Sequence, residues 1–176
     1  MLDGDSVLPR FKMTGGIMGY EISETTDDFV MSAVEVLSRL FSDDDCWAIT
    51  GSSNLFIRGV RIQPSDIDII TTRDVADRLA LSANSIVRLN FALSETETIQ
   101  SYYASATIGK ICVDIMADAV VLTRNGTWQR LDTWAKSIEY FQTKFGLVPL
   151  TTLAFERKVY LLLDNRERVR QIDALR

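Results

Sequence analysis

A glycine-serine pair and three aspartates within apolar runs constrain this chain more than any other feature of its sequence. Gly51 and Ser52 follow a short apolar run, and thirteen residues separate them from Asp66 and Asp68, which flank an isoleucine. A third carboxylate, Asp114, lies in another run of apolar residues. Such β-branched stretches are typical of strands. A lone charge is costly to bury there, so each carboxylate needs a cation or donor beside it.

The two aspartates of the Asp-Ile-Asp motif are expected to project from one face of a strand. Alternate side chains share a face, with Cα atoms about 6.6 Å apart for Asp66 and Asp68. Magnesium prefers hard oxygen ligands, and two-metal sites gather convergent carboxylates. With Asp114 added from a neighbouring strand, we expect these three residues to be metal ligands and catalytic residues. We also expect Asp114 to accept the proton of an incoming hydroxyl.

The glycine-serine turn predicts a site for a nucleoside triphosphate. Gly51 lets backbone amides approach phosphate oxygens, and the hydroxyls of Ser52 and Ser53 can donate to them. A helix that follows would favour the same anion at its N-terminus. A Gly-Ser pair or an Asp-x-Asp pair alone is more often structural than functional. Their joint occurrence in this order favours magnesium-assisted phosphoryl chemistry.

Other polar and aromatic residues have two readings each. Arg61 either faces the triphosphate or is a surface loop arginine, and Lys158 either contacts phosphate or covers an apolar face with its stem. Aromatic side chains either stack on an adenine or pack in the core. The four aromatic residues concerned are Tyr102, Tyr103, Trp128 and Trp134.

Composition excludes several classes of function. The chain contains no histidine, which removes serine-histidine and cysteine-histidine nucleophiles and the usual zinc sites. The net charge of -5 argues against a broad nucleic-acid-binding surface. No apolar stretch approaches the length of a membrane span, and the N-terminus lacks the features of a signal peptide. We therefore expect a cytoplasmic protein without a membrane partner.

Hydrophobic periodicity predicts one mixed sheet flanked by helices, an α/β (α+β) fold. We expect an N-terminal arm over residues 1–24 and a single domain over residues 25–176. The expected helices cover residues 27–41, 54–58, 73–81, 150–163 and 165–175. The expected strands cover residues 46–50, 65–71, 85–91, 102–107, 110–116, 120–122, 128–131, 137–141 and 147–148.

Three segments together resemble the signature of the nucleotidyltransferase superfamily typified by DNA polymerase beta. They are Trp47–Ser52, Arg58–Arg61 and Ser65–Ile69. Within the superfamily, the chain resembles the small bacterial and archaeal nucleotidyltransferases, which include antitoxin-type enzymes and aminoglycoside and lincosamide adenylyltransferases. The resemblance covers about residues 30–175. Its C-terminal part is looser, because Asn165–Arg168 replaces the usual arginine-lysine-aspartate run.

The resemblance implies a function and roles for individual residues. It implies transfer of a nucleoside monophosphate from ATP or another nucleoside triphosphate, with Mg²⁺ and release of pyrophosphate. Gly51 and Ser52 would bind phosphate, and a lysine at the position of Lys158 would lie near the nucleotide. The acceptor, a hydroxyl of a small molecule or a protein, cannot be identified from the sequence.

Two other classes of protein remain as alternatives. One is a catalytically weak or inactive binding or regulatory protein with the same fold, such as an antitoxin. Retention of all three aspartates argues against it, because a protein without catalytic activity has no chemical need for them. The other is a polymerase or RNA-modifying enzyme, which the acidic composition disfavours.

Overall fold

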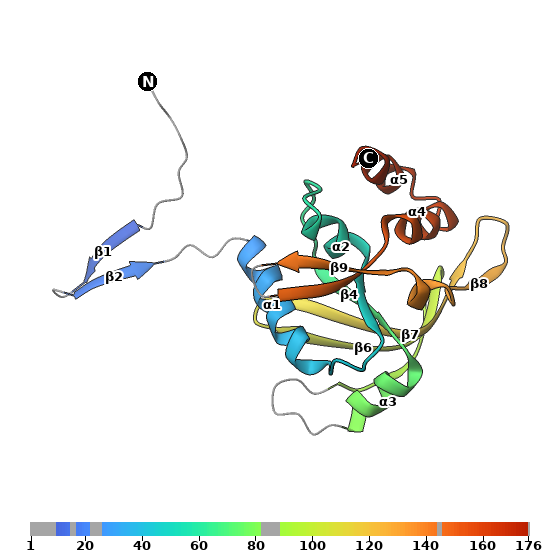
Figure 1. The fold of residues 1–176 in the computed structure, drawn as a ribbon, viewed down its shortest axis with the longest axis horizontal. Helices are drawn as coiled ribbons and strands as arrows, with labels where there is room; N and C mark the ends of the chain where they lie inside the picture. Colours follow the sequence, from blue (N-terminus) through green and yellow to red (C-terminus); the bar gives the residue numbers. More distant parts are fainter. Residues whose placement is uncertain (1–9, 15–16, 22–25, 82–88, 144–145, 176) are drawn as a thin grey trace.

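The computed structural model describes residues 10–14, 17–21, 26–81, 89–143 and 146–175 (Figure 1). The helices are α1 (Thr26–Leu40), α2 (Gly51–Ile57), α3 (Arg73–Leu81), α4 (Leu153–Leu162) and α5 (Arg166–Asp173), with a 3-10 turn at Trp134–Lys136. The strands are β1 (Arg10–Thr14), β2 (Ile17–Glu21), β3 (Trp47–Thr50), β4 (Asp66–Thr71), β5 (Ala92–Glu95), β6 (Ile99–Ile108), β7 (Ile111–Leu122), β8 (Trp128–Arg130), β9 (Ile138–Thr143) and β10 (Gly146–Thr151). None of these helices is long and apolar enough to cross a membrane.

Eight strands form one mixed sheet, in the order β5-β6-β7-β4-β3-β10-β9, with β8 paired to β7. The pairs β4–β7 and β3–β10 are parallel, and the other pairs are antiparallel. The strands β1 and β2 form a separate antiparallel hairpin, within the segment expected to be an arm. The predicted mixed sheet flanked by helices is therefore confirmed.

The two faces of the sheet carry different residues because side chains alternate along each strand. On one face, isoleucines and valines of β3, β4 and β7 pack with α1 and α3 in the main core. Its fully buried members include Val34, Leu37, Ile49, Ile67, Ile69, Val113 and Ile115. On the other face, Ala48 and Ile70 pack against Phe155 of α4. In Figure 1, α2, α4 and α5 lie above the strands of the sheet and α3 lies below them.

Most predicted elements are present, but many of their boundaries differ, and the two strands expected over residues 110–116 and 120–122 are one continuous strand, β7. Helix α2 begins at Gly51 and not at residue 54, so the glycine-serine pair belongs to its first turn. Helix α4 begins at Leu153 and not at residue 150, because β10 continues to Thr151 and the Thr152 side chain caps the helix by accepting from the backbone N–H of Phe155. The strand expected over residues 85–91 lies largely outside the described residues, and β5 begins at Ala92.

Candidate active site

Parallel pairing of β4 with β7 brings two of the predicted aspartates side by side. Asp68 pairs directly with Asp114, and Asp66 pairs with Cys112. Because residues two apart share a face, Asp66 lies on the same face as Asp68. On the other side of β4, Asp68 pairs with Thr50 at the end of β3. The carboxylates therefore project beside the turn that joins β3 to α2.

Gly51 lies directly against Asp68. Its φ of +69° is in the left-handed region that disfavours residues with a side chain. A Cβ atom at position 51 would lie 2.4 Å from Asp68 Oδ2, far inside contact distance. The backbone conformation therefore favours glycine, and any other residue here would also have to displace the Asp68 carboxylate.

Asp68 is held in an electrostatically unfavourable position. The pKa of its carboxyl group is raised to about 7, first by burial and then by the charges of Asp66, Asp114 and Glu156. The last of these, Glu156, comes from helix α4. A carboxylate with this surrounding charge is stabilised by a cation, which would favour its ionised form.

The three aspartates supply the oxygen donors that magnesium prefers, but they are not gathered into a metal site as they stand. Among the described residues, no group of three or more carboxylates or cysteines is placed to hold a metal ion. The structure therefore places Asp68 beside Asp114 and Asp66 on the same face of the sheet. These residues do not form a complete ligand shell within the described part of the chain. That Asp66, Asp68 and Asp114 hold magnesium stays a prediction, supported by the oxygen donors that these side chains offer to a hard cation.

The two serines of the turn have different environments. Ser52 is half-buried, whereas the Ser53 side chain is fully buried and its hydroxyl donates to the Thr50 carbonyl oxygen at 3.3 Å. The phosphate-binding role expected for Ser53 stays a prediction, and its buried hydroxyl is engaged inside the turn in this conformation. Ser52 is the serine whose hydroxyl can face a ligand.

Arg61 and Lys158 are both exposed, on the loop after α2 and on α4 respectively. The structure brings neither residue into a hydrogen bond or ion pair with the described part of the site, so their phosphate-binding roles stay predictions. Arg58 is placed differently. Its side chain is only 10% exposed, and it pairs with Glu139 of β9. It also donates to Asn54 Oδ1 and to the Thr151 carbonyl oxygen, at 2.7 and 3.1 Å.

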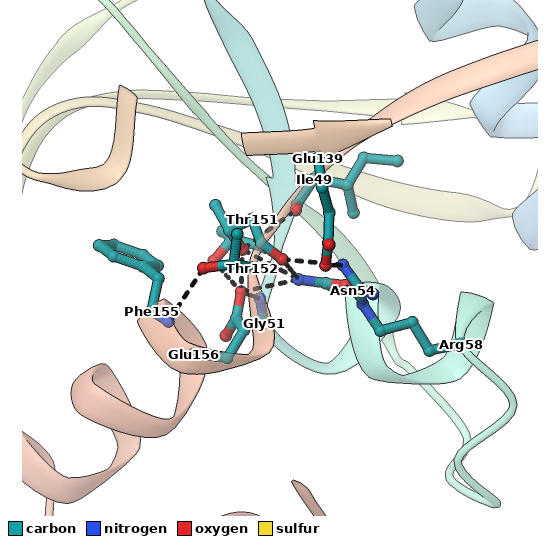
Figure 2. A network of polar contacts seen from close by, with 10 residues as sticks. Ile49, Gly51, Asn54, Arg58, Glu139, Thr151, Thr152, Phe155 and Glu156 are labelled. Carbon is teal, nitrogen blue, oxygen red and sulfur yellow. Dashed lines mark hydrogen bonds and ion pairs between the residues drawn. The ribbon is translucent and has the colours of Figure 1, made fainter. Parts of the chain in front are cut away.

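Glu156 of α4 is a part of the site that the sequence did not reveal (Figure 2). Its side chain is 1% exposed, and Oε1 accepts from Thr50 Oγ1 at 2.6 Å, Gly51 N at 3.1 Å, Asn54 Nδ2 at 3.0 Å and Thr151 Oγ1. Burial raises the pKa of Glu156, and these four hydrogen bonds oppose that rise. The available signal was its position on the apolar face of the helix, four residues before the buried Tyr160.

Tyr103 is the second residue whose role the sequence left open. Its hydroxyl donates to Asp114 Oδ1 at 2.7 Å, and Cys112 Sγ approaches the same oxygen at 3.5 Å. Burial and the Asp114 carboxylate raise the pKa of the Tyr103 phenol. Tyr103 thus contacts the carboxylate expected to act as a base. Trp134, in contrast, is buried in the core, as expected from the second of its two possible roles, packing in the core and not stacking on an adenine.

A small cavity adjoins the carboxylates of Asp68 and Glu156 between α4 and the sheet. It has a volume of about 170 Å³ and is bounded on one side by Gly51, Asp68 and Glu156. Its other walls are mainly apolar. They include Ile70, Met116, Val121, Phe155, Val159 and Leu163. The site therefore combines a strongly acidic side with an apolar side.

Comparison with solved structures identifies the architecture. A proposed nucleotidyltransferase from Thermotoga maritima superposes with a TM-score of 0.61 at 26% identity, over 81% of this chain and 91% of the other. The lincosamide antibiotic adenylyltransferase LnuA, solved with lincomycin, superposes with a TM-score of 0.53 at 9% identity, over 83% and 97% of the two chains. The fold is that of a nucleotidyltransferase.

A third structure of this fold is ANT(2'')-Ia in complex with adenylyl-2''-tobramycin. It superposes with a TM-score of 0.51 at 14% identity, over 84% of this chain and 88% of the other. No protein-family model matches the sequence, and no curated protein matches it. The resemblance inferred from the glycine-serine and aspartate motifs is therefore confirmed by similarity of structure.

Proposed function

We propose that this chain is a magnesium-dependent nucleotidyltransferase. It transfers a nucleoside monophosphate, with ATP as the expected donor, to a hydroxyl group of a small molecule or a protein and releases pyrophosphate. Two of the similar structures support a hydroxyl-bearing acceptor: one is an adenylyltransferase for lincosamides, and the other contains adenylylated tobramycin. Both have low sequence identity to this chain, so they support the class of reaction and not a particular acceptor.

The observation that carries the proposal is the arrangement of Gly51 over Asp68, with Asp114 paired to Asp68 on the next strand. The left-handed glycine lets a turn approach the carboxylates more closely than any other residue would permit. A triphosphate bound along that turn would have its charged oxygens next to Asp66 and Asp68. The negative charges of the phosphates and of the aspartates can share this space only with a cation between them.

Each group of the site has a distinct part in the proposed reaction. Asp66, Asp68 and Asp114 would hold magnesium, which when bound neutralises the phosphates and aligns the α-phosphate for in-line attack. The contacts from Tyr103 and Cys112 both end on Asp114 Oδ1. Within the described residues Oδ2 of Asp114 receives no such contact, so it is the oxygen that can accept the proton of the acceptor hydroxyl.

The experiment that tests this proposal is label transfer. The protein is incubated with magnesium and α-labelled nucleoside triphosphates in the presence of cell extract, and the products are separated. We expect magnesium-dependent transfer of label and release of pyrophosphate, both abolished in Asp66→Ala. Asp74→Ala is the matched control, because Asp74 is an exposed aspartate on α3 and lies outside the site.

Direct binding of magnesium and ATP, measured by calorimetry, separates the two main alternatives. Binding without any transfer would identify a binding or regulatory protein that retains the fold. Absence of both binding and transfer in the wild-type protein would overturn the proposed function. Transfer that persists in Asp66→Ala would overturn the role of the aspartates.

A further inference from the structure

Glu156 collects donors from three separate elements on a single oxygen atom. Thr50 ends β3, Gly51 and Asn54 belong to α2, and Thr151 ends β10. All four of their hydrogen bonds end on Oε1 of Glu156. A carboxylate is suited to this position because it is an acceptor only, its charge strengthens each hydrogen bond, and each oxygen has two lone pairs that the donors can share.

The cost of placing a carboxylate here is considerable. Glu156 is 1% exposed, and its charge adds to the repulsion at Asp68. A buried apolar side chain would pack against α2 and the sheet without that cost. The four hydrogen bonds therefore have to provide something that packing alone would not, and what they fix is the conformation of the turn.

The surrounding contacts make the turn dependent on this one side chain. The Asn54 side-chain amide donates to the Thr151 carbonyl oxygen at 2.8 Å and to Thr151 Oγ1 at 2.9 Å, as well as to Glu156. Arg58 Nε donates to Asn54 Oδ1 at 2.7 Å. Figure 2 shows these side chains converging between α2, α4 and the end of β10. Removal of Glu156 would leave Thr50, Gly51 and Asn54 without their shared acceptor.

We propose that Glu156 is a positioning residue that holds the Thr50–Gly51 turn at its working distance from Asp68. It acts from a helix more than 100 positions later in the chain, since Thr50 and Glu156 are 106 positions apart. In this structure the Gly51 N–H donates to Glu156 Oε1 at 3.1 Å, and the phosphate-binding role expected for Gly51 stays a prediction. The effect on nucleotide binding rests on the proposed function, whereas the effect on the turn does not.

The experiment compares three variants of the full chain. Glu156→Ala removes the acceptor, and Glu156→Gln retains an oxygen acceptor but no charge. Thr152→Ala is the matched control, because Thr152 caps the same helix by accepting from Phe155 N at 3.2 Å and, in the described part of the chain, makes no hydrogen bond to the Thr50–Gly51 turn. The measurements are hydrogen exchange of the Gly51 amide by NMR, with no nucleotide present, and the dissociation constant for ATP with magnesium.

We expect Gly51 exchange to be at least about tenfold faster in Glu156→Ala, with partial protection in Glu156→Gln and wild-type protection in Thr152→Ala. The affinity for ATP with magnesium should fall in the same order, by about tenfold or more in Glu156→Ala. If Glu156→Ala does not fold, Glu156→Gln decides the question by the same two measurements.

Two outcomes would overturn the inference. One is unchanged Gly51 exchange in both Glu156 variants. The other is loss of Gly51 protection and ATP affinity in Thr152→Ala as large as in Glu156→Ala, which would show a general effect of weakening α4. If the wild-type protein binds no ATP, the proposed function fails, and the exchange measurement still decides whether Glu156 positions the turn.

Discussion

Among single residues, Asp68 depends strongly on its surroundings. Its pKa is raised from an ordinary value of 3.8 to about 7, first by burial and then by neighbouring carboxylates. The folded protein therefore binds this proton more tightly than the unfolded chain does. The contribution of Asp68 to stability is fully present below about pH 4 and is lost as the pH rises through about 7.

Asp68→Asn should remove this pH dependence. Without magnesium, the free energy of unfolding of the wild-type protein should fall relative to that of the variant by about 2–3 kcal/mol between about pH 5 and about pH 8. Urea unfolding at the two pH values, with a chelator present, measures the difference. A constant difference between the two proteins across this range would show that the Asp68 carboxyl group titrates normally.

Tyr103 is expected to influence the reaction through Asp114. In Tyr103→Phe the hydrogen bond to Asp114 Oδ1 is lost, and a hydrogen bond to a charged group is typically worth about 1.5–3 kcal/mol. We expect kcat for nucleotidyl transfer to fall about tenfold or more, with little change in the KM for ATP, because Tyr103 contacts the base and not the glycine turn. Steady-state kinetics with a labelled triphosphate measure both constants.

The matched control for this variant is Tyr102→Phe. Neighbouring residues of a strand face opposite sides of the sheet. The Tyr102 ring stacks on Phe91, and the Arg73 guanidinium group lies over the same ring. Loss of its hydroxyl should leave kcat near the wild-type value. An equal loss in both variants would indicate damage to β6 and not a specific effect on Asp114.

At the level of elements, Arg58 joins α2 to strands β9 and β10. In Arg58→Ala, Asn54 Oδ1 loses the hydrogen bond from Arg58 Nε, and the ion pair between the buried Arg58 side chain and Glu139 is lost. We expect a loss of about 3 kcal/mol in the free energy of unfolding, measured by urea denaturation. Glu139→Ala should cost about 0–1 kcal/mol, because the glutamate is 45% exposed and exposed charge is well solvated. Equal losses would contradict a structural role for the Asn54 and Thr151 contacts.

The boundaries of elements show where local sequence patterns fail. The strands that carry the aspartates were predictable, because β-branched residues around a charged position are a local signal. The start of α2 was not predictable, because a glycine-serine pair signals a turn. Thr50 and Gly51, at the first helical turn, donate hydrogen bonds to Glu156, which lies far away in the sequence. The start of α4 was predicted too early for a similar reason, because pairing of β10 with β9 extends the strand to Thr151.

For the whole molecule, the proposed function predicts stabilisation by ligand. A ligand present at about 100 times its dissociation constant stabilises the folded state by about 2.7 kcal/mol. For a chain of this length, that corresponds to a rise in Tm of about 5–10 °C. We expect this rise with magnesium and ATP together, a smaller rise with either alone, and none in Asp66→Ala. Differential scanning fluorimetry measures it, and an equal rise in Asp66→Ala would place the ligand elsewhere.

The sequence by itself determined most of the strands and helices and the identity of the three aspartates and the glycine, because each depends on residues close together along the chain. The tertiary structure alone decided which of them meet. Parallel pairing placed Asp68 beside Asp114, antiparallel pairing of β6 with β7 brought Tyr103 to Asp114, and a distant helix brought Glu156 to the site. Glu156 resembles an ordinary helix residue in the sequence, since the four donors that define its environment come from other elements. Hydrogen bonds between groups about 100 positions apart leave no local pattern, so only the folded chain reveals them.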